Sequence, residues 1–366
     1  MRVFVTVPRL DRSAVVPELH GSPSCHWTCP FGGLGRGSGI GRGSSSAFNP
    51  VELFLMKRVQ YHRYGGPEEL RIEEVALPET GRGQIRVRIK AAAANPMDWK
   101  IRNGELRMMT GRKFPRGLGH DFAGVVEAVG PNVTRFKVGD EVFGATGLTE
   151  SGAFAEALVT EEKTVFFKPQ SLSFEEAAPL PIVSATAWTA LIDRAKLRAG
   201  QRVFITGCLG GVGRAAAQIA GMRGAEIAGS CSASRRDEAL ALGVQEVVDY
   251  RAFNANTYRG RFDVVFDTHG ALSLSQCGAM LKRGGVALHI VPTPLKMIWS
   301  MLSSRHQTIF TRLTPQCIAG IVEAAQQGKL APAIGRTVPL SEAIPAIIEL
   351  EKTGLPRGKL MISPMR

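Results

Sequence analysis

The chain has 366 residues, of which 44% are hydrophobic and 21% charged, and its formal net charge at pH 7 is +13. This length predicts about two domains whose cores need neither disulfides nor metal ions for stability. The Lys and Arg residues are scattered without a block of like charges, and no apolar stretch approaches the ~20 residues that span a bilayer, so we expect no nucleic-acid partner and no stable membrane insertion.

The first part of the chain, residues 1–55, differs in composition from the rest. Gly32–Ser46 is a low-complexity run of mainly glycine and serine, and because no strand pattern leads into it, we do not interpret it as a phosphate loop. We predict that residues 1–55 form a flexible extension and that the folded protein begins at Met56. The extension is either a tail or sequence upstream of the true initiator. The protein is expected in the cytoplasm, or in an organelle if residues 1–55 act as a transit segment.

Six cysteines are spread along the chain, which is typical of a reducing compartment. Cys25 and Cys29 are the only close pair, and only His20 and His26 are available nearby as further ligands. A structural zinc site needs four well-placed ligands. We therefore interpret the pair as two free thiols rather than as a metal or redox site.

Between Val59 and about Pro181 the sequence consists of short apolar runs broken by Gly and Pro. Alternation of apolar and polar residues is typical of half-buried strands. Many short strands at close spacing predict a small, barrel-like β domain. The clearest predicted strands are Gln84–Ala91, Phe122–Val129 and Asp140–Phe143.

From about Ala187 strand-like runs alternate with segments of helical periodicity, which predicts a parallel sheet with right-handed crossovers. The predicted strands are Val203–Thr206, Ala225–Gly229, Glu246–Val248, Val264–Phe266 and Val286–Ile290. The predicted helices between them are Val212–Met222, Arg235–Leu242 and Leu272–Leu281.

The strongest local signal is a glycine turn between an apolar strand and a helix of small residues. Gly207, Gly210, Gly211, Val212 and Gly213 follow the strand and open the helix. Glycines let a backbone approach a pyrophosphate, and the helix start offers unpaired N–H groups and the positive end of a dipole. The order of strand, turn and helix in a βαβ series predicts a dinucleotide-binding domain, against the alternative of a tight turn without a ligand.

The residues after the next strand indicate which dinucleotide to expect. NAD sites place a carboxylate about 20 residues on, at the ribose 2′-OH, but here Ser232, Arg235 and Arg236 precede the first carboxylate, Asp237. Hydroxyl and guanidinium groups suit a 2′-phosphate. We therefore predict NADPH as the cofactor, with Ser232 and Arg235 as 2′-phosphate ligands and Arg236 as a substitute. The alternative is that these arginines merely begin a surface helix.

Two further regions follow the fifth predicted strand. Met297–Arg305 is an apolar stretch with a basic end, and four interpretations of it stay open: ordinary packing, a lid over a hydrophobic acceptor, a dimer contact, or a membrane-surface helix. After about Pro315 the chain forms a tail that is able to return to the first domain. Its apolar segments are Cys317–Gln327, Ser341–Lys352 and Lys359–Ile362.

Several segments, taken in order, resemble the medium-chain dehydrogenase/reductase superfamily, and most closely its zinc-free quinone oxidoreductase branch. The similarity runs from about Met56 to Ile362 and so covers nearly all of the chain beyond the extension. The segments that carry it are Ala91–Gly104, Leu118–Gly130, Arg135–Gly144, Gly207–Gly213, Leu242–Tyr250 and Arg357–Ile362.

The resemblance implies an α/β fold in which a GroES-like β-barrel domain accompanies a Rossmann domain with a doubly wound parallel sheet. The implied boundaries are residues 56–181 for the GroES-like catalytic domain, 182–317 for the Rossmann NADPH-binding domain and 318–366 for a return to the catalytic domain. The nicotinamide and the substrate would lie between the two domains. A homodimer built through Rossmann-domain edges is also implied.

The resemblance also bears on metal binding. Where zinc-dependent relatives carry their first Cys ligand, this sequence has Asn95, and no cysteine lies between Cys29 and Cys208 to build a structural zinc lobe. His120 without a thiolate partner is a poor zinc site, so we interpret it as a structural or cleft residue. We expect no bound metal.

Without a metal that polarises a carbonyl, the compatible chemistry is hydride transfer from NADPH to an acceptor that is already electrophilic. The resemblance places Asn95 and Thr186 near the nicotinamide as catalytic candidates. It places Tyr250 near the adenosine phosphate and Lys359 near the cofactor. The plain alternatives are a turn at Asn95, a helix hydroxyl at Thr186 and a packed ring at Tyr250.

The predicted substrate is a quinone or a similar activated acceptor such as an enone. Related enoyl-thioester reductases use a tyrosine as proton donor, whereas no tyrosine lies here between Tyr64 and Tyr250. This favours quinones, whose reduced oxygens can take protons from water. Two alternatives stay open: an NADPH-dependent 2-alkenal or enone reductase, and a non-catalytic NADPH-binding protein of the same fold.

Overall fold

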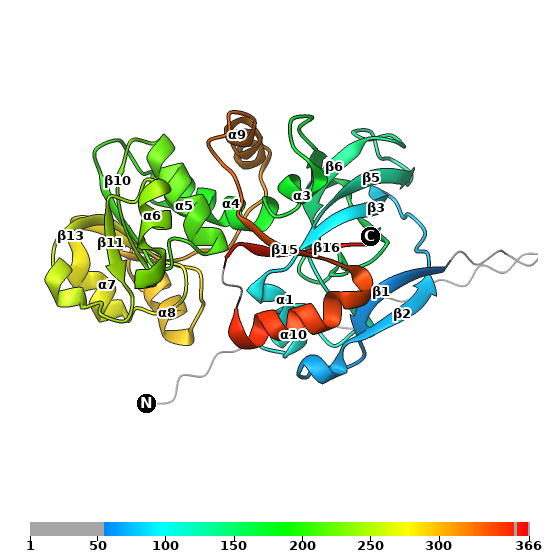
Figure 1. The fold of residues 1–366 in the computed structure, drawn as a ribbon, viewed down its shortest axis with the longest axis horizontal. Coiled ribbons are helices and arrows are strands. Elements are labelled where there is room, and N and C mark those ends of the chain that lie inside the picture. The colour runs from blue at the N-terminus through cyan, green and yellow to red at the C-terminus, as the bar shows by residue number, and fades with distance from the viewer. Residues whose placement is uncertain (1–54, 355–356, 365–366) are drawn as a thin grey trace, which may run out of the picture. The chain divides into compact units, whose positions relative to one another are not determined.

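The computed structural model describes residues 55–354 and 357–364. The predicted extension lies outside the described residues apart from Leu55, and so do Cys25 and Cys29. The described residues belong to one compact unit, in which two lobes are built on separate sheets (Figure 1). Among these residues no helix has the length and apolar character needed to cross a membrane.

The parallel sheet of the second lobe has six strands in the order β11-β10-β9-β12-β13-β14. Every neighbouring pair is parallel, and the chain passes from the central strand first to one side and then to the other. This is the doubly wound arrangement of a Rossmann domain, so the predicted fold class is confirmed. Its strands are β9 Arg202–Ile205, β10 Glu226–Cys231, β11 Glu246–Asp249, β12 Phe262–Asp267, β13 Leu281–His289 and β14 His306–Thr308.

Helices cover this sheet. Helix α5, which follows β9, packs closely on it because its inner side chains are small. Gly213, Ala216 and Ala217 are among the buried residues of α5. The predicted helix at Leu272–Leu281 is shorter in the structure, because Ser273 caps its start and Leu281 already opens β13. The helices of this lobe are α4 Pro181–Trp188, continued by a π-helical segment at Thr189–Arg194, α5 Gly211–Met222, α6 Arg236–Ala241, α7 Leu274–Met280, α8 Pro294–Leu302 and α9 Pro315–Gln326.

The first lobe is built on mostly antiparallel strands, as expected for a GroES-like domain. One sheet has the order β15-β16-β3-β5-β6-β8, with β7 also paired to β3, and a smaller one has the order β2-β1-β4. The strands are β1 Leu55–Tyr61, β2 Arg71–Ala76, β3 Gln84–Ala93, β4 Arg116–Gly117, β5 Asp121–Val129, β6 Glu141–Ala145, β7 Ala157–Glu161, β8 Val165–Phe167, β15 Ile334–Pro339 and β16 Lys359–Ser363. The helices are α1 Pro96–Arg102, α2 Arg107–Thr110, α3 Phe174–Ala177 and α10 Ala343–Thr353.

The chain returns to the first lobe after the parallel sheet is complete. Strand β16 pairs with β3 through Met361 opposite Ala93 and Ile362 opposite Ala92. Helix α9, by contrast, contributes its buried face to the core of the second lobe and packs against α4. The predicted boundary between residues 317 and 318 thus falls inside α9, and the return to the first sheet begins with β15. This return brings Lys359 to the glycine turn of the other lobe.

Candidate functional site

The glycine turn connects β9 to α5. Gly207 has a backbone φ of +56°, a conformation that residues with a Cβ rarely adopt. A Cβ on Gly213 would lie 2.1 Å from the carbonyl oxygen of Gly207, so the helix packs directly on the turn. Gly210 is the N-cap of α5, and Gly211 and Val212 are its first two residues. The unpaired N–H groups at the start of a long helix therefore adjoin the turn, which is the arrangement of a phosphate site.

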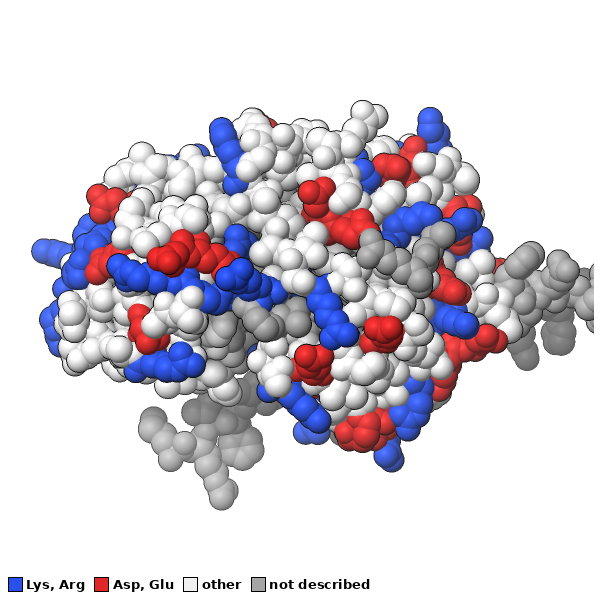
Figure 2. Space-filling view, in the orientation of Figure 1, with Lys and Arg blue, Asp and Glu red and all other residues white. Residues whose placement is uncertain are grey.

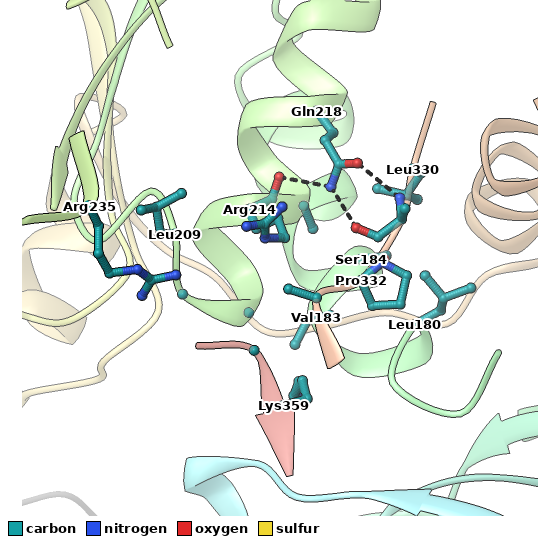
Figure 3. Close-up of a pocket in the computed structure, with 16 residues that line it drawn as sticks. Leu180, Val183, Ser184, Leu209, Arg214, Gln218, Arg235, Leu330, Pro332 and Lys359 are labelled. Atoms are coloured by element: carbon teal, nitrogen blue, oxygen red, sulfur yellow. Dashed lines mark hydrogen bonds between the residues drawn. The ribbon is translucent and has the colours of Figure 1, made fainter. Parts of the chain in front are cut away.

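A pocket of about 110 Å³ lies beside this turn. Residues of α4, of the turn, of the segment before β15 and of β16 line it, so both lobes contribute (Figure 3). Its cationic side chains are Arg214, Arg235 and Lys359. Whole small-molecule sites usually begin at roughly 300 Å³, so this pocket forms one part of any dinucleotide site.

Three guanidinium groups gather around a single carboxylate at this pocket. Arg235 donates to Glu238 through Nε at 2.9 Å and Nη2 at 2.8 Å. Arg214 also pairs with Glu238, and Arg357 Nε lies 4.0 Å from it. Three positive charges against one negative charge leave a net positive group that suits a phosphate. The sequence indicated Arg235 but not Arg214 or Arg357, because their spacing along the chain does not show that they converge.

The other predicted ligands of the adenosine end lie at the carboxyl ends of β10 and β11. Ser232 Oγ is hydrogen-bonded to Ser234 Oγ at 3.2 Å. Tyr250 is 53% exposed, and its backbone N–H donates to the Cys231 carbonyl at the end of β10. Arg236, the substitute ligand, donates to the carbonyl of Val247 instead of lining the pocket.

A buried polar cluster within the first lobe connects the start of α1 with β5 and β16. Asn95 Nδ2 donates to Asp121 Oδ2 at 2.9 Å, while Asn95 Oδ1 accepts from Lys359 Nζ. The Asn95 N–H donates to Asp98 Oδ2 at 2.7 Å, and the other oxygen of Asp98 is 2.7 Å from His120 Nδ1. Asn95 reaches this position because it is the N-cap of α1, with Asp98 completing the capping box. The sequence did not predict that these five side chains form one cluster.

Burial changes the acid–base properties of two members of this cluster. It raises the pKa of Asp121 to about 7, against the opposing effect of the Lys359 charge. It lowers the pKa of Lys359, against the opposing effects of Asp121 and Asp98. Both changes have the same physical cause, since a low-dielectric environment disfavours the charged form of each group.

Thr186 belongs to a different hydrogen-bonded group from Asn95. Its hydroxyl donates to the Ile182 carbonyl at 2.6 Å and is 2.6 Å from Thr311 Oγ1. The N–H of the same Ile182 donates to Asp121 Oδ1 at 3.1 Å. Helix α4 therefore carries Thr186 and also donates to Asp121, which in turn accepts from Asn95 of the other lobe.

Few side chains around Asn95 are placed to ligate a zinc ion. Asn95 Oδ1 already accepts from an ammonium, and His120, whose Nδ1 is bonded to Asp98, offers only its buried Nε2. A fixed cation beside the same oxygen repels a second one. Within residues 55–354 and 357–364, no group of three or more His, Cys, Asp or Glu side chains is placed to hold a metal.

Comparisons with known proteins agree with this architecture. Residues 81–170 match the family model of the alcohol dehydrogenase GroES-like domain, and residues 242–362 match the model described as zinc-binding dehydrogenase. A quinone-oxidoreductase homolog from Spinacia oleracea, described as chloroplastic, is 33% identical over 85% of this chain and 99% of its own length. A quinone oxidoreductase of Homo sapiens is 33% identical over 80% of this chain and 93% of its own length. The solved structure of the quinone oxidoreductase from Coxiella burnetii has a TM-score of 0.78 at 28% identity and covers 85% of this chain and 99% of that one.

Proposed function

The chain belongs to the quinone oxidoreductase-like family of the medium-chain dehydrogenase/reductase superfamily, and from this premise we propose that it reduces a quinone or a similar activated acceptor with NADPH, without zinc. The observation that carries the proposal is the pairing of a phosphate-type glycine turn with a guanidinium group at one pocket. The ammonium of Lys359 beside Asn95 disfavours a metal ion at the same oxygen and so supports the zinc-independent part.

The residues of the pocket fit NADPH. The start of α5 at Gly210 and Gly211 would hold the pyrophosphate. Arg235, together with Ser232 three residues before it, would hold the 2′-phosphate. When bound, the reduced nicotinamide supplies the hydride. The protein supplies orientation, and the buried cluster at Asn95 supplies polar groups for the acceptor oxygen.

The acceptor is tested by measuring NADPH oxidation against a panel of quinones and alkenals, repeated with NADH and after dialysis against a chelator. We expect turnover with quinones that favours NADPH and survives the chelator. Preferential turnover of alkenals would support the enone reductase alternative instead. Tight NADPH binding without turnover of any acceptor would indicate the non-catalytic alternative.

Replacement of Arg235 by alanine is expected to narrow the preference for NADPH over NADH by about tenfold or more, because a charge-assisted bond to the 2′-phosphate contributes roughly 1.5–3 kcal/mol. Fluorescence titration gives the dissociation constants of NADPH and NADH, and their ratio measures the preference. Arg236→Ala is the matched control, since this neighbouring guanidinium donates to Val247. An unchanged ratio in Arg235→Ala, or a change in the control only, would place the phosphate elsewhere.

A homodimer is the proposed assembly. Helix α8 packs against β14, which lies at the edge of the parallel sheet, and exposes several large apolar side chains. Sedimentation of the wild type is expected to give a dimer, and Met301→Glu with Leu302→Glu is expected to give a monomer. Met108→Glu, an equally exposed methionine of α2, is the control. A monomeric wild type that binds anionic vesicles through these residues would support the membrane-surface alternative.

The expected location stays the cytoplasm, with an organelle as the alternative. The chloroplastic description of the Spinacia oleracea relative supports the alternative. Fractionation of cells that express the full chain with a C-terminal tag distinguishes the cytoplasmic from the organellar location.

A further inference from the structure

We propose that Lys359 is a catalytic residue whose ammonium donates a proton to the acceptor oxygen when the acceptor is reduced. This inference rests on the proposed function and deepens it. The sequence-based interpretation assigned Lys359 to the cofactor and let water supply the proton. The hydrogen bonds of the Lys359 amine and its buried surroundings favour a role at the acceptor.

The Lys359 side chain extends from the start of β16 past the glycine turn and ends at Ala94 and Asn95. Its Cε lies 3.3 Å and its Nζ 3.8 Å from the position that a Cβ on Gly211 would take. Nζ then donates to Asn95 Oδ1 and, at 3.1 Å, to the carbonyl of Ala94. The amine thus lies near the helix start that suits a phosphate, but both of its hydrogen bonds go to the first lobe, one of them to the catalytic candidate Asn95. Figure 3 shows Lys359 among the residues that line the pocket.

The charge of Lys359 is not used in an ion pair. Its two hydrogen bonds go to neutral oxygens, and an ammonium has three donors, so one N–H is left for a ligand. Arg214 and Arg235 also line the pocket, but both are paired with Glu238. Among the described residues that line this pocket, Lys359 is therefore the cation without a carboxylate partner.

The surroundings make loss of a proton from Lys359 easier than from an exposed lysine. Burial lowers the pKa of Lys359, and only the more distant charges of Asp121 and Asp98 oppose this. Asn95 connects Nζ to Asp121, and His120, bonded to Asp98, is the remaining titratable group of the cluster. General acid catalysis favours a donor whose pKa is shifted toward neutral pH. Binding of a phosphate would gain nothing from such a shift.

The proposed step conserves atoms and electrons. The acceptor gains one hydride, which brings both electrons, and would then carry a negative charge on its oxygen. One Nζ–H bond of Lys359 breaks as an O–H bond forms on the acceptor. The neutral amine then regains a proton from solvent, so that one quinone consumes one hydride and one proton.

Lys359→Ala is expected to lower kcat by about 10²–10⁴-fold, the usual contribution of a general acid. The dissociation constant for NADPH is expected to change by less than about threefold, because the lost interaction is made during the reaction and not with the cofactor. Small primary amines added to the variant should restore turnover, with a rate that depends on the pKa of the amine. Lys359→Arg, which keeps its proton, should stay slow. Lys163→Ala, at a lysine that is 78% exposed, is the matched control.

A second experiment measures the titration of Lys359 directly and does not depend on catalytic turnover. Lysines of the wild-type apoprotein are dimethylated with ¹³C-formaldehyde, and the signal of Lys359 is assigned by its loss in Lys359→Arg. We expect this signal to titrate at lower pH than the signals of the exposed lysines. This measurement remains valid even where the alanine variant is unstable.

The results that would contradict the role of Lys359 as a proton donor can be told apart. A rise in the NADPH dissociation constant with unchanged kcat would show that Lys359 holds the cofactor, as the sequence suggested. Absence of amine rescue, or titration together with the exposed lysines, would also overturn the proposal. Failure of the proposed function differs from all of these, because the wild type itself would then reduce no acceptor.

Discussion

A Gly213→Ala variant is expected to bind NADPH at least about 100-fold more weakly than the wild type and to lose roughly 1–3 kcal/mol of unfolding free energy. The added Cβ would lie 2.1 Å from the Gly207 carbonyl oxygen and 2.9 Å from the Cys208 Cα. Both are backbone atoms that cannot rotate away. The start of α5 must therefore move off the turn, which removes its N–H groups from the pyrophosphate. Fluorescence titration and urea unfolding measure the two effects.

Gly221→Ala is the matched control on the same helix. The nearest heavy atom to its added Cβ is Ile227 Cδ1, at 3.9 Å, which is ordinary contact. We expect unchanged NADPH binding and a gain of about 0.5–1 kcal/mol, because alanine stabilises a helix interior relative to glycine. Wild-type affinity in Gly213→Ala would mean that this turn does not hold the cofactor.

Lys296→Met is expected to destabilise the protein by about 3–5 kcal/mol, the usual cost of leaving a buried charge unpaired. Lys296 Nζ donates to Asp267 Oδ2 at 2.9 Å, and the Asp267 side chain is fully buried. Burial alone would raise the pKa of Asp267, but His289, whose Nδ1 lies 3.8 Å from Oδ2, and the bond from Lys296 hold it well below its usual range. A carboxylate with a depressed pKa stabilises the fold above its unfolded pKa and loses this contribution as the pH falls. The deficit of the variant should therefore be at its full size near pH 7 and shrink as the pH falls below about 4, the unfolded pKa of an aspartate, as urea unfolding would show.

The double variant Lys296→Met with Asp267→Asn tests the electrostatic origin of this loss. Removal of both charges should recover part of the stability, because the amide still accepts from the Ala271 N–H and no charge stays buried. A double variant as unstable as the sum of the two single variants would indicate that packing, not charge, is lost. Replacement of the exposed Lys282, whose ion pair with Asp263 lies near the surface, should cost less than about 1 kcal/mol.

The elements that the sequence predicted well are those with a strong apolar period. The strand β3 alternates buried Ile85, Val87 and Ile89 with more exposed residues, and the small residues of α5 mark its buried face. Strand β14 is different, because its three residues His306–Thr308 carry no apolar pattern. It is a strand only because β13 offers it a partner, which is a tertiary effect.

The candidate site likewise contains residues that the sequence identifies and contacts that only the fold creates. Gly207 and Gly213 could be identified from sequence because a tight turn needs glycine at fixed spacing. The contact between Lys359 and Asn95 could not be predicted, since they are 264 positions apart in the sequence and only the return of β16 brings them together. The convergence of Arg214 and Arg357 on Glu238 likewise depends on how α5, α6 and the tail are oriented.

The position of β16 beside β3 also bears on synthesis of the protein. Ala92 and Ala93 of β3 pair with a strand whose first residue, Lys359, follows Ala94 by 265 residues. At roughly 5–20 residues per second, a ribosome leaves that edge without its partner for tens of seconds. An open strand edge is a template for pairing with other chains. Slower translation is therefore expected to increase aggregation of the nascent polypeptide, and chaperones that shield strand edges should raise the yield.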